Sequence, residues 1–313
     1  MNFLHLAASL LVTASSVNAM GDLGFCIGTK DNSGVCKYTD GYKEDLQKLA
    51  PYTNTIRFYS TSDCNTLQWL APALVAENFK AVVGIWPTDD THYQMDKDAA
   101  STYLPQMSID NVVAFTVGSE ALYRKDLTPQ QLADKISDFK NFVSGIKDKD
   151  GKSYSSVPVG TADSWNVLVD GYNAPAVQAC DLVLANAFSY WQGQVMNNAS
   201  YSFIDDIMQA VQQVQSIKGT DDIDFWVGET GWPTDGGNYE SAQPSVDNAE
   251  TFWQQGICAI RAWGINTFVF EGFDEAWKPP STGQNGQEVQ GVERFWGVYD
   301  ANGTLKYDLS CKF

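Results

Sequence analysis

Short apolar runs recur along the chain and alternate with longer segments whose apolar residues are spaced as on one face of a helix. The runs are nearly continuous in apolar character, which is typical of strands buried on both faces of a parallel sheet. The expected strands are 23–28, 55–59, 80–85, 112–117, 157–161, 182–187, 224–228 and 267–271. Eight such strands alternating with helices predict an α/β protein with a single-domain (β/α)8 TIM barrel.

The helix with the clearest start signals is expected from Pro129 to about residue 147. Thr128 is a good N-cap, Pro129 suits the first turn, and Gln131 stands at the capping-box position. After the eighth strand the pattern becomes irregular. Three further features are expected: helices at 203–218 and 246–263, and a hairpin turn at Asn302-Gly303.

An open doubly wound sheet is the alternative arrangement of alternating strands and helices. It favours a nucleotide fingerprint after the first strand, but Gly28-Thr29-Lys30-Asp31 is neither GxGxxG nor a P-loop. The sequence therefore favours the barrel, and no cofactor is expected. No repeat or Pro/Ser-rich linker divides the chain, so one catalytic domain is expected over 20–313.

The N-terminus resembles a targeting segment. Residues 1–19 contain an apolar stretch too short to span a bilayer and end in Val17-Asn18-Ala19, with small residues at both key cleavage positions. The alternative is a buried N-terminal strand or helix. Residues 309–313 lack the hydrophobic tail of a lipid-anchor signal. We therefore expect a signal peptide at 1–19 and a secreted, extracellular protein without a membrane anchor.

The charge of the chain limits its partners. The 313 residues include 38 acidic and 20 basic ones, for a net charge of -18. Such a protein repels phosphate backbones and anionic membrane surfaces. The composition therefore argues against nucleic acid as a partner and favours a neutral substrate.

Six cysteines and two sequons are consistent with the secretory pathway. The cysteines lack the CxxC spacing of a zinc site, and an even number in a secreted chain suggests disulfides, with fifteen possible connectivities. Their positions are Cys26, Cys36, Cys64, Cys180, Cys258 and Cys311. The sequons begin at Asn198 and Asn302, which are candidate glycosylation sites.

Few kinds of catalytic chemistry are well supplied with residues. His92 is the single histidine after residue 19, and no GxSxG elbow occurs, so a serine hydrolase triad and a His-ligated metal site are both poorly supported. Carboxylates and aromatic residues are plentiful. This combination suits a glycosidase, in which two acids flank the scissile bond and aromatic rings stack on sugar faces.

Two glutamates stand out because reacting groups in a (β/α)8 barrel lie at the carboxyl ends of strands. The fourth expected strand runs through Gly118 and Ser119 into Glu120, and the seventh runs through Gly228 into Glu229. A glycine before each acid permits close backbone approach or an unusual φ. A carboxyl separation of roughly 5 Å would indicate a retaining mechanism, and a wider one an inverting mechanism.

A structural role for the same glutamates is the alternative. A buried carboxylate then needs a basic partner, and Arg57 at the end of the second expected strand is the obvious one. Other acids near strand ends compete with the pair for the catalytic role. They are Asp89, Asp163, Glu271, Asp274 and Glu275.

Three segments together resemble glycoside hydrolase family 17, especially its fungal cell-wall β-1,3-glucanase and glucanosyltransferase branch. They are Val117-Gly118-Ser119-Glu120, the run Trp226-Val227-Gly228-Glu229-Thr230-Gly231-Trp232-Pro233-Thr234, and Phe273-Asp274-Glu275-Ala276-Trp277-Lys278. The resemblance implies a retaining mechanism with Glu120 as general acid/base and Glu229 as nucleophile. Many relatives have Asn directly before the acid/base, whereas this chain has Ser119.

The resemblance and the strand ends suggest further substrate-binding residues. Aromatic residues near strand ends, including Trp86 and Trp191, are candidates for glucose-stacking subsites, although Trp is as often packed between barrel and helices. Glu275 and Lys278 match polar positions beside the family's cleft, and a salt bridge between them is an equally sufficient explanation. The expected substrate-binding set is Tyr59, Ser119, Asn186, Tyr190, Trp232, Glu275 and Lys278.

Three functional hypotheses follow. The first is a retaining β-1,3-glucan hydrolase and β-1,3-glucanosyltransferase that acts as a monomer in cell-wall remodelling. The second is a non-catalytic glucan-binding wall protein, because fold alone does not establish catalysis. The third keeps the chemistry and changes the substrate to mannan or xylan. The intact acid pair favours an enzyme over the binding protein.

Overall fold

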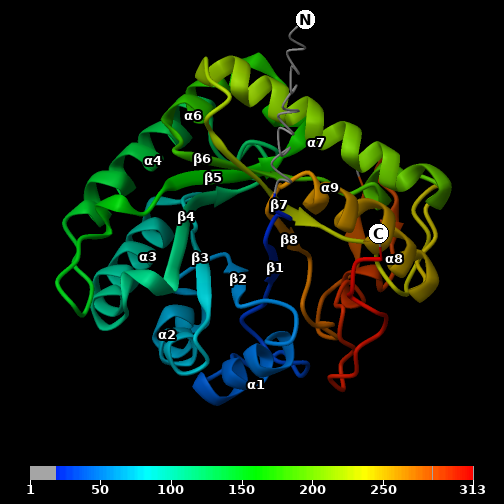
Figure 1. The fold of residues 1–313 in the computed structure, drawn as a ribbon, viewed down its shortest axis with the longest axis horizontal. Coiled ribbons are helices and arrows are strands. Elements are labelled where there is room, and N and C mark those ends of the chain that lie inside the picture. The colour runs from blue at the N-terminus through cyan, green and yellow to red at the C-terminus, as the bar shows by residue number, and fades with distance from the viewer. Residues whose placement is uncertain (1–18, 284, 313) are drawn as a thin grey trace, which may run out of the picture.

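The structure, a computed structural model, describes residues 19–283 and 285–312. The predicted signal peptide therefore lies outside the described residues, except for Ala19. Eight parallel strands pair in chain order and close into a barrel surrounded by helices (Figure 1), which confirms the predicted fold. The strands are β1 Leu23–Cys26, β2 Thr55–Phe58, β3 Lys80–Ile85, β4 Val112–Ser119, β5 Val159–Ser164, β6 Leu182–Asn186, β7 Asp224–Thr230 and β8 Thr267–Val269.

Helices connect successive strands and cover the outside of the barrel (Figure 1). They are α1 Thr39–Leu49, α2 Thr66–Ala76, α3 Asp90–Tyr103, α4 Pro129–Ser144, α5 Trp165–Leu168, α6 Ala174–Ala179, α7 Met196–Lys218, α8 Val246–Phe252 and α9 Cys258–Ala262. Short 3-10 turns lie at Asp63–Asn65, Leu104–Gln106, Ile109–Asn111, Tyr154–Ser156, Gly171–Asn173, Tyr190–Gln192 and Val292–Arg294. After β8, β9 Ser281–Thr282 and β10 Glu288–Val289 form an antiparallel pair.

The local sequence signals explain where several elements begin and end. α4 starts with the predicted capping box, because Thr128 and Gln131 bond each other's backbone N–H groups. α7 begins at Met196 rather than after Ser202, since its first turns carry small and polar residues that give no apolar period. The expected helix 246–263 is divided by a π-helical turn, Trp253–Ile257. The predicted hairpin turn at Asn302-Gly303 is present, with Tyr299 bridging Leu305.

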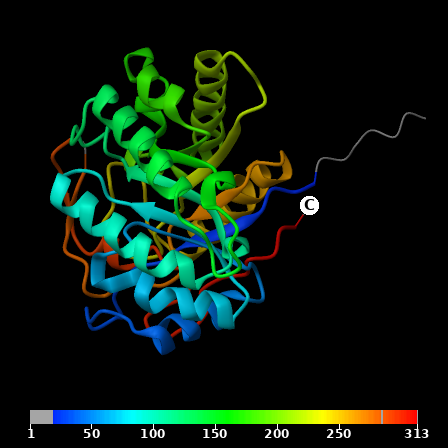
Figure 2. The same cartoon turned by 90° about the vertical axis from the view of Figure 1, so that its left-hand side faces the viewer.

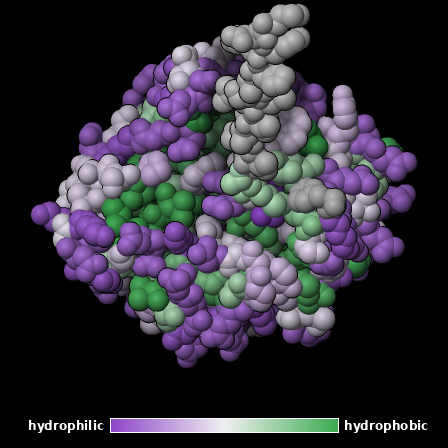
Figure 3. Space-filling model, viewed as in Figure 1, coloured by the Kyte–Doolittle hydropathy of each residue, from purple (hydrophilic) through white to green (hydrophobic). Residues whose placement is uncertain are grey.

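The core has an inner and an outer part. The inner cluster fills the barrel and includes Cys26, Val82, Trp226 and Phe268, while a larger cluster lies between the barrel and its helices. Most of the face shown in Figure 3 is hydrophilic, with smaller hydrophobic areas between. Among the described residues, no helix has both the length and the apolar character to cross a bilayer.

The disulfides suggested by the sequence are present, but they use only four of the six cysteines. Disulfides join Cys36 to Cys64 and Cys258 to Cys311, and the second ties the C-terminal segment to α9. Cys26 and Cys180 remain buried thiols. They cannot meet because Cys26 belongs to the cluster inside the barrel and Cys180 to the one outside it, so the sheet separates them. The blue start of the described chain and its red end lie on the same side of the molecule (Figure 2).

Candidate active site

A cavity of about 530 Å³ opens at the carboxyl ends of the barrel strands. Its walls come from β7 and from residues that end or follow β4, β5, β6 and β8, so five successive strands contribute to it. This is the end of a (β/α)8 barrel where active sites lie. The lining residues are Glu120, Tyr123, Arg124, Ser164, Trp165, Asn166, Asn186, Phe188, Trp191, Gln192, Glu229, Phe270, Ser281, Thr282, Gly283, Glu293 and Trp296.

Glu229 reaches the cavity from β7 with its charge already paired. The Arg57 Nη1 atom lies 2.8 Å from Glu229 Oε1 and also donates to the Gly228 carbonyl at 2.9 Å. Arg57 is fully buried, so this attraction acts in a medium of low polarity. The absence of a side chain at Gly228 is required, since a Cβ there would lie 2.7 Å from Asn186 Oδ1. Glu229 is therefore held in a buried ion pair with the Arg57 guanidinium.

Glu120 reaches the same cavity through an unusual backbone turn. It follows β4 directly and has a φ of 57°, after Gly118 with a φ of 90°. A left-handed φ is uncommon for a glutamate, and such strained residues cluster at functional sites. The Glu120 N–H donates to the Ala162 carbonyl on β5 at 2.9 Å, which holds the turn. The Asn186 Nδ2 atom then donates to Glu120 Oε1 at 3.2 Å.

The surroundings of Glu120 favour its protonated form. Burial and the nearby negative charge of Glu229 raise the pKa of Glu120 from 4.5 to about 7, and the hydrogen bond from Asn186 opposes this rise. The carboxylate of Glu229 has a cation at 2.8 Å, whereas the carboxyl group of Glu120 accepts from an amide at 3.2 Å. One cavity thus holds a carboxyl group suited to donate a proton and a carboxylate suited to stay charged.

The structure brings part of the predicted substrate-binding set to these glutamates. Asn186 lines the cavity and contacts Glu120. Ser119 is buried beneath it, where its hydroxyl accepts from Arg57 Nη2 at 3.1 Å and donates to Glu229 Oε1 at 3.2 Å. The Tyr59 ring lies 4.9 Å from the Arg57 guanidinium carbon. Ser119 and Tyr59 therefore support the cation and the nucleophile candidate from below.

Tyr190 and Trp232 lie behind the cavity wall, not on it. Both are buried; the Tyr190 hydroxyl donates to the Gly237 carbonyl at 2.5 Å and the Trp232 indole N–H to the Gln243 carbonyl at 3.0 Å. Their rings meet edge to face at 5.7 Å. Tyr190 also packs against Trp296, which does line the cavity. In this structure the two rings brace the wall and have no face open to a sugar.

Glu275 and Lys278 form a separate buried cluster with Glu271. The Lys278 Nζ atom lies 2.8 Å from Glu271 Oε1 and 2.7 Å from Glu275 Oε2. The same Nζ is 4.5 Å from the centroid of the Phe270 ring, and Phe270 lines the cavity. The two predicted residues therefore lie behind the wall, in the salt bridge that was the alternative explanation for them.

Sequence reasoning missed several cavity residues. Trp165 follows the last residue of β5, but the expected strand ended at residue 161, three residues too early for Trp165 to be noticed. Glu293 and Trp296 lie in the irregular region after β8, where no periodic pattern locates them. No sequence pattern marks Arg124 as a cavity residue. Its position becomes clear only in the fold, where its Nη2 atom donates to the Ser119 carbonyl at 2.7 Å.

The described residues contain no group of three or more His, Cys, Asp or Glu side chains that could hold a metal ion. The reactive groups of the cavity are its carboxyl groups: Glu120, Glu229 and Glu293. Burial raises the pKa of Glu293, with Lys278 opposing and Glu229 adding to the rise. Glu293 lines the cavity, while Glu120 and Glu229 have the better matched environments for acid and nucleophile.

A closed (β/α)8 barrel with two unlike carboxyl groups in one cavity at the carboxyl ends of strands four and seven defines a glycoside hydrolase. The family model described as glycosyl hydrolases family 17 matches residues 23–311, and the chain belongs to this family.

Relatives in sequence and in structure agree with this assignment. The chain is 58% identical over 307 residues to a glucan 1,3-beta-glucosidase of Saccharomyces cerevisiae, covering 98% of this chain and 96% of that protein. It is 47% identical to a glucan 1,3-beta-glucosidase of Schizosaccharomyces pombe, covering 97% and 91%. An active-site mutant of Rhizomucor miehei beta-1,3-glucanosyltransferase in complex with laminaritriose superposes with a TM-score of 0.76, at 27% identity over 93% of this chain and 98% of that one.

Proposed function

We propose that this protein is a retaining glycoside hydrolase that cleaves β-1,3-glucan and transfers the released glucan segment to another sugar chain. The observation that carries the proposal is the contrast between Glu120 and Glu229 within one cavity of a family 17 barrel. The substrate follows from the relatives named glucan 1,3-beta-glucosidase and beta-1,3-glucanosyltransferase.

In the first step Glu229 acts as nucleophile and Glu120 as acid. A Glu229 carboxylate oxygen forms a bond to the anomeric carbon as the glycosidic C–O bond breaks. Glu120 gives its proton to the departing glycosidic oxygen, which leaves as a neutral hydroxyl group. Arg57 and Ser119 hold the Glu229 carboxylate in place through contacts of 2.8 and 3.2 Å to its Oε1 atom.

In the second step Glu120 acts as base. Its carboxylate takes the proton of an incoming hydroxyl group, whose oxygen bonds to the anomeric carbon as the bond to Glu229 breaks. Water as acceptor gives hydrolysis, and a glucan hydroxyl gives transfer. The cavity wall carries Trp165 and Trp191, whose partly exposed rings offer apolar faces to glucosyl units of donor or acceptor.

The remaining predictions are consistent with a wall enzyme. We infer a signal peptide over 1–19 ahead of a catalytic domain over 20–313, and action of a monomer in the extracellular space and cell wall. Asn198 and Asn302 are both exposed and therefore accessible to glycosylation. Asn186 and Ser119 are proposed to act at the cavity, and Tyr59, Tyr190, Trp232, Glu275 and Lys278 to support it from behind.

The test is a time course with one defined laminari-oligosaccharide, in which the product lengths are measured. We expect shorter products together with products longer than the substrate, which hydrolysis alone cannot generate. Initial rates on mannan and xylan serve as the comparison. Binding of laminari-oligosaccharides without any cleavage would favour the non-catalytic glucan-binding protein. Equal rates on β-1,3-glucan, mannan and xylan would refute the substrate assignment.

A further inference from the structure

The cavity occupies only part of the barrel rim. Its lining residues come from β4 to β8 and the loops after them, and none of them comes from the loops after β1, β2 and β3. A glucan chain longer than the cavity that is bound across Glu120 and Glu229 can extend onto the loops after β2 and β3. We propose that Trp86, which follows β3, and His92, in the first turn of α3, form a further subsite for one glucosyl unit of such a chain. This subsite rests on the proposed function.

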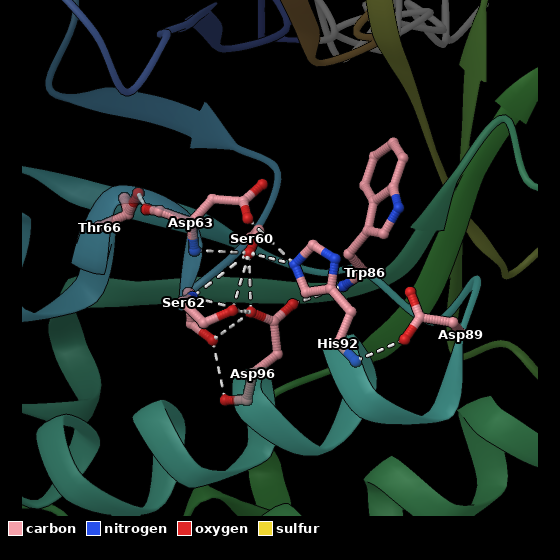
Figure 4. A network of polar contacts seen from close by, with 9 residues as sticks. Ser60, Ser62, Asp63, Thr66, Trp86, Asp89, His92 and Asp96 are labelled. Atoms are coloured by element: carbon pink, nitrogen blue, oxygen red, sulfur yellow. Dashed lines mark hydrogen bonds and ion pairs between the residues drawn. The ribbon is translucent and has the colours of Figure 1, made fainter. Parts of the chain in front are cut away.

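The rim after β2 and β3 is built around one buried carboxylate, Asp96 of α3. It is fully buried and accepts hydrogen bonds from both neighbouring loops (Figure 4). From the loop after β2 it accepts the Ser60 hydroxyl at 2.7 Å, the Thr61 hydroxyl at 3.1 Å, and the Ser62 N–H and hydroxyl at 2.8 and 2.6 Å. From the end of β3 it accepts the Trp86 N–H at 2.6 Å. Several donors around one carboxylate fix both loops in a single arrangement.

Trp86 connects this rim to the catalytic cavity. Its backbone is held by Asp96, and its partly exposed indole points away from that carboxylate (Figure 4). The Arg124 guanidinium carbon lies 4.9 Å from the centroid of the indole ring. Arg124 lines the cavity and contacts the Ser119 carbonyl, next to Glu120. The indole thus adjoins the cavity on the side lined by the residues that follow β4.

His92 supplies polar groups beside this ring. Its Nε2 atom lies 3.2 Å from the Ser60 hydroxyl and 3.2 Å from Asp63 Oδ1, and its ring centroid is 6.5 Å from that of Trp86. The side chains of His92 and Asp63 are 23% and 57% exposed. An aromatic ring with accessible donors and acceptors beside it is the composition that binds a neutral sugar, which presents apolar C–H faces and hydroxyl groups.

A purely structural role of Trp86 makes a different prediction. If the indole only packs against Arg124, its loss disturbs Ser119 and Glu120 and lowers activity on all substrates by the same factor. If it binds a distant glucosyl unit, its loss affects only substrates long enough to reach it. Dependence on chain length therefore separates the two roles.

The experiment compares kcat/KM on laminari-oligosaccharides of increasing length for the natural protein and for Trp86→Ala. We expect the ratio of kcat/KM on the longest to that on the shortest cleaved oligosaccharide to fall by about tenfold, the size of one lost stacking contact. Trp86→Phe keeps a ring and should recover most of this ratio. Trp263→Ala is the matched control, since Trp263 is 59% exposed and lies just before the amino end of β8, at the other end of the barrel.

Two results would overturn the subsite. An equal loss of kcat/KM at all lengths in Trp86→Ala assigns the ring a packing role, and an unchanged kcat/KM at every length assigns it no role. In both cases cleavage by the natural protein still supports the proposed function. Failure of the natural protein to cleave any laminari-oligosaccharide would refute the function together with the subsite.

Discussion

Two clusters of buried carboxyl groups lie on either side of the cavity wall, and each contains one cation. In the first, Arg57 pairs with Glu229 while Glu120 shares its cavity. In the second, Lys278 pairs with both Glu271 and Glu275. Burial raises the pKa of Glu120 in one cluster and of Glu271 in the other. Perturbed acidity alone therefore does not distinguish a reactive site from a structural ion-pair network.

Access to the cavity distinguishes them. Both Glu120 and Glu229 line the cavity, whereas Glu271 and Glu275 direct their carboxylates at Lys278 behind the Phe270 ring. The carboxyl groups of the first cluster are accessible to a substrate in the cavity, whereas those of the second are ion-paired with Lys278. Substituting one residue of either cluster at a time tests this difference.

The largest effect is expected for Glu229→Gln. The amide keeps the shape of the side chain and cannot attack the anomeric carbon, so kcat/KM should fall at least about 10⁴-fold on a laminari-oligosaccharide. The folded state should persist, as judged by circular dichroism. Glu271→Gln, the matched substitution in the cluster behind the wall, should lower kcat/KM by far less. A comparable loss in both variants would show that cavity access does not separate the clusters.

The next effect is on stability, from Lys278→Met. Removing the cation leaves Glu271 and Glu275 buried without a positive partner, which typically costs about 3–5 kcal/mol. The loss should be larger at pH 8 than at pH 5, because burial raises the pKa of Glu271 and acid neutralises this carboxyl group. Urea unfolding at both pH values measures it. A loss below 1 kcal/mol at pH 8 would contradict the structural role of the cluster.

The sequence predicted the architecture well because the barrel strands are buried on both faces and carry continuous apolar runs. β3, for example, runs from Lys80 to Ile85 as expected. Helix limits were predicted where end signals exist, as at Thr128. Where the first turns are polar, as in α7, the start was misplaced by several residues.

The site was predicted where chemistry coincides with a strand end and missed where it depends on contacts between distant segments. Glu120 and Glu229 follow apolar runs, and the structure places both in one cavity. No local pattern distinguishes Tyr190, which is buried behind the wall, from Trp165, which lines it. That difference is decided by packing against residues such as Trp296, more than a hundred positions away in the chain.

The smallest effect, and the most specific for the first cluster, is a pH-dependent gain in stability in Glu120→Gln. In the folded protein the pKa of Glu120 is about 7, so the side chain keeps its proton up to about that pH. In the unfolded chain its pKa is 4.5, and the proton is released near that pH. Folding therefore carries no penalty from Glu120 below pH 4.5. As the pH rises through 7 the penalty grows to about 3 kcal/mol, because the carboxylate must then ionise in a buried site beside Glu229. Glutamine never ionises and removes this penalty.

Thermal and urea unfolding of Glu120→Gln and of the natural protein should consequently coincide near pH 4.5 and separate by up to about 3 kcal/mol near pH 8, with the variant more stable. Activity should change in the opposite sense, falling about 10²- to 10⁴-fold because the general acid is lost. Glu275→Gln is the matched control: its ion pair with Lys278 is broken, so that variant should be less stable near pH 8. A stabilised Glu275→Gln or a destabilised Glu120→Gln at that pH would reverse the assignment of the reactive and the structural cluster.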